Sequence, residues 1–189
     1  WANAPFYQWG RKDPLLPSDG TTNTDKPYYD TQYNPRGSVN STAIKDVILY
    51  PYKFNTSTGN GSLELWNKGN TIGTVNNNTI YKTIYSPSPA NYVEPKSAAY
   101  TGFSQSNSTG GFNKGLNFYS YPNSTGPTIF FPALGYYNNS LAYVNTMATY
   151  WAGPASATSA THLGFDASNL YTNFENPRTY GFSIYPVSE

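Results

Sequence analysis

Hydrophobic and polar residues alternate in short segments along this chain, and glycine and proline separate the segments. There are sixteen glycines and fifteen prolines, and no long segment has the period of an amphipathic helix. β-Branched and aromatic residues dominate most segments, which predicts short strands. We expect strands over Val47–Phe54, Thr79–Tyr85, Leu116–Tyr121, Thr128–Leu134, Thr161–Phe165 and Thr179–Val187.

The last of these strands shows the clearest alternation. Tyr180, Phe182 and Ile184 fall on one face, which would pack on a core. Two short helices are also expected. One lies within 41–46, where a serine or threonine can cap it, and one runs from Pro95 toward Tyr100. The polar segments 55–62, 101–113 and 122–127 are expected to be loops.

The composition favours recognition over catalysis. Nineteen residues are tyrosine, one is histidine and none is cysteine, and tyrosine with serine, glycine and asparagine is typical of binding surfaces. Charged residues make up 11% of the chain, and the formal net charge is +1. Such a chain has no basic patch for nucleic acid. It also has no apolar run long enough for membrane insertion, so we expect one folded, soluble domain.

Five motifs occur in an order that resembles one family. The motifs are Tyr7–Pro14, Lys82–Pro89, Phe131–Tyr136, Tyr150–Trp151 and Arg178–Ile184. The chain resembles the major paralogous domain of Bacteroidetes and Fibrobacter surface proteins, and the likeness spans nearly all of it. The resemblance implies an α+β, C-type-lectin-like single domain over 1–189, with short antiparallel strands, one or two short helices and long loops. It also implies an extracellular location on a cell or phage surface.

The family is often the C-terminal or fimbrial-tip module of a larger adhesin, so the resemblance implies a partner domain upstream of Trp1. Related folds serve as variable proteins of diversity-generating retroelements, in which the C-terminal residues are diversified. Two cysteines that are customary in the family are replaced here by Ser88 and Pro186. If those cysteines normally pair, these two positions should lie close in space.

The C-terminal third is the expected ligand-binding face. The site would bind a protein or glycan on another cell or host surface, without a cofactor. The alternative for 136–150 is an ordinary polar hairpin whose tyrosines cover the edge of the core. The candidate ligand-binding residues are Tyr136, Tyr137, Asn138, Asn139, Tyr143, Asn145, Tyr150, Asn169, Tyr171, Asn173 and Asn176.

Other classes of function remain as alternatives. A structural pilus-tip or assembly module would use flat surfaces or an unpaired strand edge instead of a ligand site. An enzyme is disfavoured because His162 has no serine, cysteine or acidic partner at a recognisable spacing. Calcium is disfavoured because Glu94-Pro95-Lys96 carries a lysine beside its only carboxylate. Arg178 and the segment 11–14 are expected to be scaffold, and Trp151 is expected in the core.

Overall fold

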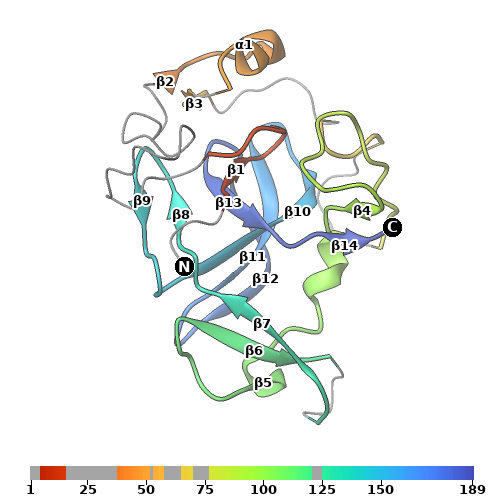
Figure 1. The fold of residues 1–189 in the computed structure, drawn as a ribbon, viewed down its shortest axis with the longest axis vertical. Helices are drawn as coiled ribbons and strands as arrows, with labels where there is room; N and C mark the ends of the chain where they lie inside the picture. Colours follow the sequence, from red (N-terminus) through yellow and green to blue (C-terminus); the bar gives the residue numbers. More distant parts are fainter. Residues whose placement is uncertain (1–4, 16–37, 52, 58–64, 70–76, 121–124) are drawn as a thin grey trace, which may run out of the picture.

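The computed structural model describes residues 5–15, 38–51, 53–57, 65–69, 77–120 and 125–189. Among these residues, 40% lie in strands and 9% in helices, so the fold is mostly β-sheet (Figure 1). The expected α+β, C-type-lectin-like fold is therefore wrong. No helix within the described ranges is long and apolar enough to cross a membrane.

The largest sheet has seven strands, and six of them follow one another in the order β12-β11-β10-β13-β8-β9. The seventh strand, β1, pairs with β13. All neighbours are antiparallel except β10 and β13, which run parallel. The strands are β1 (Tyr7–Gln8), β8 (Tyr136–Tyr137), β9 (Leu141–Ala142), β10 (Ala148–Ala155), β11 (Ser159–Phe165), β12 (Leu170–Pro177) and β13 (Gly181–Ile184).

Each face of this sheet carries its own hydrophobic core. On one face, Tyr150 and Leu163 pack with Phe118 and Phe131 of the sheet β5 (Ser108–Thr109), β6 (Gly115–Tyr119) and β7 (Thr128–Pro132). The 3₁₀ helix η1 (Ser97–Tyr100) adds to this core through its last residue. On the other face, the neighbouring Trp151 packs with the N-terminal segment, because successive side chains of a strand point to opposite faces.

The remaining elements lie around the main sheet. Figure 1 shows the β5–β7 sheet at one end of the molecule and α1 at the other. A short parallel pair and an antiparallel pair complete the sheets. These elements are α1 (Ile44–Leu49), η2 (Gln105–Asn107), the parallel strands β2 (Ser38–Val39) and β3 (Phe54–Asn55), and the antiparallel strands β4 (Tyr92–Val93) and β14 (Val187–Ser188).

The pairing of β4 with β14 bears on the prediction that Ser88 and Pro186 lie close in space. Val187, next to Pro186, pairs with Val93, and the neighbouring Glu94 accepts a hydrogen bond of 2.9 Å from the Ser88 hydroxyl. The two segments are therefore neighbours in the fold.

Three strand predictions hold well, at β6, β7 and β11, and a fourth survives only as the shorter β13. The prediction of a strand over Val47–Phe54 is wrong, because its first three residues belong to α1 and, of its described residues, only Phe54, in β3, lies in a strand. Ile44, Val47 and Ile48 have helical spacing and line one cavity beside Trp9. Thr79–Tyr85 forms only an isolated bridge between Lys82 and Asn67. The segment from Pro95 becomes the 3₁₀ helix η1.

Two long strands were not predicted, namely β10 and β12. β10 contains alanine, glycine and proline, which are poor strand formers. It forms because all eight residues are buried between the two cores, where small residues are needed. A Cβ added at Gly153 would lie 2.9 Å from Ile80 Cδ1. The expected loops 55–62 and 122–127, and Tyr121, lie partly or wholly outside the described residues.

Candidate functional site

Three tyrosines stack at one edge of the main sheet. The ring centroid of Tyr136 lies 5.4 Å from that of Tyr143 and 5.6 Å from that of Tyr180, with interplanar angles of 25° and 10°. Tyr143 is 59% exposed, whereas Tyr136 and Tyr180 are partly buried. Burial, with the neighbouring phenols, raises the pKa of Tyr136. We call these three residues the tyrosine stack.

The backbone that carries Tyr143 is in an unusual conformation. Tyr143 has φ +59°, and Asn139 and Asn145 also have positive φ. A bulky residue in this region is a genuine outlier, and such strain persists only where the surroundings enforce it. The carbonyl of Tyr143 accepts hydrogen bonds of 3.0 Å from the N–H groups of both Thr146 and Met147. These bonds fix the turn that places the exposed ring of Tyr143 against Tyr136.

Gly135 allows the close approach of the backbone on the two sides of the β8–β9 hairpin. Its φ is +76°, and a Cβ at this position would lie 2.2 Å from the carbonyl oxygen of Ala142. Only glycine lets the two sides of the β8–β9 hairpin approach so closely. The hydroxyl of Thr149 donates a hydrogen bond of 2.9 Å to the carbonyl of Gly135. The hairpin is therefore anchored to the buried strand β10.

Two of the predicted binding residues belong to the core. Tyr137 and Tyr150 are each 2% exposed, so they cannot contact a ligand, and their assignment to the surface is corrected. Their hydroxyls donate to the carbonyls of Asn139 at 3.1 Å and Pro132 at 2.6 Å. Burial raises the pKa of Tyr137 to about 12 and that of Tyr150 further. Alternation along β8 turns one tyrosine outward and the next inward.

The other predicted residues form two groups. Near the stack, Asn138 is half-buried, and Asn139 and Asn145 are exposed. The segment 166–178 is a turn followed by the strand β12. The Asp166 carboxylate accepts backbone hydrogen bonds at this turn, which lowers its pKa. On this side, Asn169, Tyr171 and Asn173 are exposed, and Asn176 is half-buried.

The two groups do not converge. β12 is the first strand of the sheet order and β8 the fifth, and four strand spacings span roughly 19 Å. A row of ring contacts joins the two edges on one face of the sheet. The centroid distances are 5.7 Å for Phe174–His162, 4.8 Å for His162–Phe182 and 6.0 Å for Phe182–Tyr136. The middle of this row is buried, so a ligand can reach only its ends.

His162 is a buried member of that row. It is 1% exposed, and its Nε2 lies 3.3 Å from the side-chain nitrogen of Asn176. Burial lowers the pKa of His162 to about 4, partly offset by a hydrogen bond with the Phe174 backbone. The imidazole is therefore neutral at physiological pH. Trp151 is also in the core, as expected.

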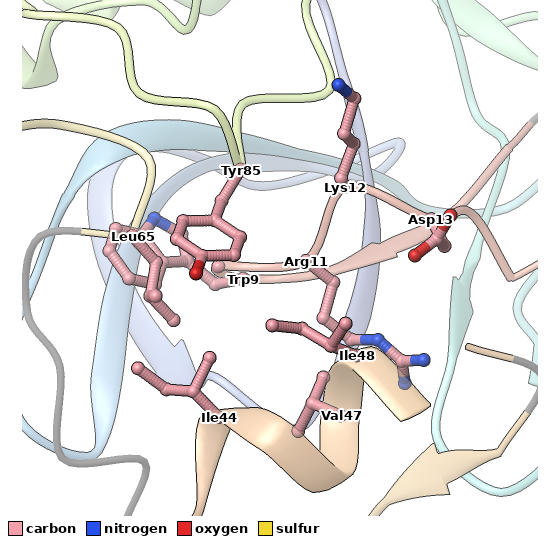
Figure 2. A pocket seen from close by; sticks show the side chains of 10 residues that line it. Trp9, Arg11, Lys12, Asp13, Ile44, Val47, Ile48, Leu65 and Tyr85 are labelled. Carbon is pink, nitrogen blue, oxygen red and sulfur yellow. The ribbon is translucent and has the colours of Figure 1, made fainter. Parts of the chain in front are cut away.

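A small cavity beside the Arg11 motif has no room for a substrate. Figure 2 shows Ile44, Val47 and Ile48 of α1 facing Trp9, Leu65 and Tyr85 across it. Its volume of about 40 Å³ leaves space for only a few waters, since one water needs about 10–15 Å³ by this measure. The cavity is therefore a gap in the packing beneath α1.

Arg11 and Arg178 brace the backbone, as the scaffold prediction requires. Arg11 donates to the carbonyls of Tyr50, Pro51 and Lys53, at 3.3, 2.7 and 2.6 Å, just after α1 ends. Arg178 lies 4.5 Å from the Trp9 ring centroid and donates to the carbonyl of Ala157 at 3.3 Å. Burial lowers the pKa of each guanidinium to about 10. Neither arginine is placed for a ligand.

Glu94 is enclosed within the fold. It is fully buried, and its Oε1 accepts hydrogen bonds from the hydroxyls of Ser86 and Ser88 at 2.7 and 2.9 Å. Within the described part of the chain, no three histidine, cysteine, aspartate or glutamate residues cluster as metal ligands.

No protein-family model, curated protein or solved structure matches this chain. Membership of the surface-protein family therefore stays a prediction. The residue that sequence reasoning missed is Tyr180, which was assigned to the core face of the last strand. The alternation of Tyr180, Phe182 and Ile184 was the signal for this residue. Tyr180 directly precedes β13, so it is only partly buried at the margin of the core.

Proposed function

We propose that this protein is a non-enzymatic recognition domain of a cell surface, and that it binds a carbohydrate through the tyrosine stack. The observation that carries the proposal is the exposed ring of Tyr143, which stacks on Tyr136. The backbone of Tyr143 itself has φ +59°. A residue that only covered the core edge would not need this strained backbone, whereas strain of this kind concentrates at binding sites. The flat phenol offers a stacking surface for the apolar face of a sugar ring.

The surroundings of the stack suit a polar ligand. Asn138, Asn139 and Asn145 lie on the same hairpin segment, and their amides supply both donors and acceptors. No charged residue lies between 136 and 150. A rigid aromatic surface with adaptable amides around it is the combination that recognition surfaces use.

The test replaces Tyr143 by asparagine. Asparagine tolerates the left-handed conformation, so the variant removes the ring and keeps the loop. Wild type, Tyr143→Asn, Tyr143→Phe and Tyr171→Ala are each applied as labelled protein to an array of host and bacterial glycans. We expect Tyr143→Asn to lose binding, Tyr143→Phe to keep most of it, and Tyr171→Ala, at the opposite edge, to bind like wild type.

The stability of the variants separates binding from packing. Tyr143→Asn loses a stacking contact worth about 1 kcal/mol and relieves left-handed strain of similar size, so its melting temperature should stay close to that of wild type. Undiminished glycan binding by Tyr143→Asn would refute the proposal. A wild-type protein that binds no glycan but captures a protein through Tyr143 would refute the choice of carbohydrate and retain the site.

An assembly module is the second candidate, and strand β12 favours it. β12 has eight residues and lies at the end of the sheet order, and no other described strand pairs with its outer side. Tyr171 and Phe174 on it are 46% and 50% exposed. Long, apolar edges of this kind invite pairing with another chain. Sedimentation experiments on the wild type should show an assembly, and replacing both residues by lysine should dissociate it. A wild type that sediments as a monomer would exclude the assembly module.

A further inference from the structure

A pocket of about 270 Å³ is lined in part by Asn145, on the segment that follows Tyr143. It is formed between the loop before β6, the end of β7 and the segment after β9. Phe130, Pro132 and Leu134 form its apolar wall, and Asn113, Lys114 and Asn145 supply its polar groups. Asn145 is two residues from Tyr143, so the pocket and the stack share one loop. Its volume is near the lower end of small-ligand pockets, about 300 Å³.

The backbone of this pocket is built around Ala133. The Ala133 N–H donates to the carbonyl of Lys114 at 2.7 Å, and the Ala133 carbonyl accepts from the N–H of Asn145 at 2.7 Å. Lys114 and Asn145 both have positive φ, +56° and +65°. Two non-glycine residues in the left-handed region thus lie on either side of one buried residue. Lysine in this conformation is uncommon and indicates a constraint beyond chain folding.

Gly115 sets the position of the aromatic wall. Its φ is +150°, and an added Cβ would lie 2.6 Å from Cζ of Phe130 and 2.4 Å from the carbonyl oxygen of Phe131. Phe130 is 36% exposed, so a ligand can reach its ring. The glycine therefore lets a large aromatic ring lie directly against the start of β6, next to Lys114.

The polar side chains of the pocket are available to a ligand. Within the described residues, the side chains of Asn113, Lys114 and Asn145 take part in no hydrogen bond or ion pair of the protein. Lys114 is the sole charged residue among those that line the pocket. The pocket therefore combines a positive charge, two amides and an aromatic ring, and none of the described residues that line it is a carboxylate.

We propose that this pocket binds a carboxylated six-membered sugar, such as a hexuronic acid unit of the glycan that the tyrosine stack recognises. The inference rests on the proposed function and adds the class of sugar. The sugar ring stacks on Phe130, its hydroxyls exchange hydrogen bonds with Asn113 and Asn145, and its carboxylate pairs with the ammonium of Lys114. A charge-assisted hydrogen bond of this kind discriminates strongly against an uncharged analogue.

The experiment is a titration of the ¹⁵N-labelled full chain, followed by NMR. Methyl glucuronide is compared with methyl glucoside, which differs from it by the carboxylate alone. We expect the glucuronide to shift the signals of Asn113 and Asn145 and to bind about tenfold more tightly than the glucoside. Lys114→Asn, which keeps the left-handed conformation, should remove that preference, and Lys114→Arg should retain it.

Several results would overturn the inference. Equal affinities for the two sugars, absent shifts at the pocket, or an unchanged preference in Lys114→Asn would each do so. Tyr171→Ala, at the opposite edge of the sheet, serves as the control, since it should leave binding of the single sugar in the pocket unchanged. If glycan binding depends on Tyr143 but the pocket gives no shifts, the inference fails and the proposed function stands. If neither responds, both fail.

Discussion

His162 should make the stability of this protein depend on pH in a way that a single substitution removes. The imidazole is 1% exposed and lies among Trp151, Phe174 and Phe182. Burial lowers its pKa from 6.5 to about 4. Because the folded-state pKa lies below that of the unfolded chain, the unfolded chain binds more protons between these values. Stability is therefore complete above pH 6.5 and is lost as the pH falls toward 4.

The magnitude follows from the two pKa values. Each unit of difference corresponds to about 1.4 kcal/mol, so complete protonation of His162 would remove about 3 kcal/mol of the free energy of unfolding. Between pH 7 and pH 5 the loss should be about 2 kcal/mol. His162 is the sole histidine of the chain, and carboxylates have ordinary pKa values near 4. The imidazole therefore dominates this interval.

The assay is urea unfolding followed by tryptophan fluorescence at pH 7, 6 and 5, for wild type and for His162→Phe. Phenylalanine suits the aromatic surroundings and cannot be protonated. We expect the free energy of unfolding of wild type to fall by about 2 kcal/mol over this interval, and that of His162→Phe to change by less than about half as much. Equal changes in both proteins would show that His162 does not titrate as a buried group, and would refute the reasoning.

Two further predictions concern the scaffold. Gly135→Ala should lower the free energy of unfolding by more than about 2 kcal/mol, since left-handed alanine costs about 1–2 kcal/mol and its Cβ would also meet the Ala142 carbonyl. Gly110→Ala, with φ +78° and nothing within 4 Å of the added Cβ, isolates the conformational cost, and equal losses would contradict the steric argument. Arg11→Lys should cost at least about 2 kcal/mol, because lysine cannot replace the fork that binds several carbonyls. Exposed Lys12→Ala should change the melting temperature little, and a similarly small effect of Arg11→Lys would exclude the bracing role.

A strand could be predicted where its own residues favour the strand conformation, and not where burial in the fold decides it. Leu116–Tyr119 and Thr161–Phe165 carry large apolar or β-branched residues, so their own composition favours the strand. β10 owes its form to burial on both faces, which no local pattern announces. The short helix expected within 41–46 forms as the start of α1, but its second half was assigned to a strand. Val47 and Ile48 fit a helical face as well as a strand, and Trp9 and Leu65, distant in the sequence, decide between the two.

The candidate site was predicted in its residue types but not in its geometry. The sequence placed Tyr136, Tyr143 and Tyr171 in one face, whereas the sheet order separates Tyr171 from the other two by several strands. The order of strands depends on long-range pairing, such as the parallel contact of β10 with β13, which sequence patterns do not encode. The positive φ of Tyr143 was equally hidden, because the sequence around it contains none of the usual left-handed residues except asparagine.

The number of tyrosines is weaker support for recognition than their conformation. Tyr100, Tyr137 and Tyr150 are buried, and their rings serve the core as phenylalanine would, with hydroxyls bound to protein carbonyls. Composition alone does not separate such residues from a binding surface. Tyr143 differs from these buried tyrosines, because its ring is mostly exposed and its backbone is strained. The proposed ligand site would account for this strain, and the Tyr143→Asn variant is the experiment that tests it.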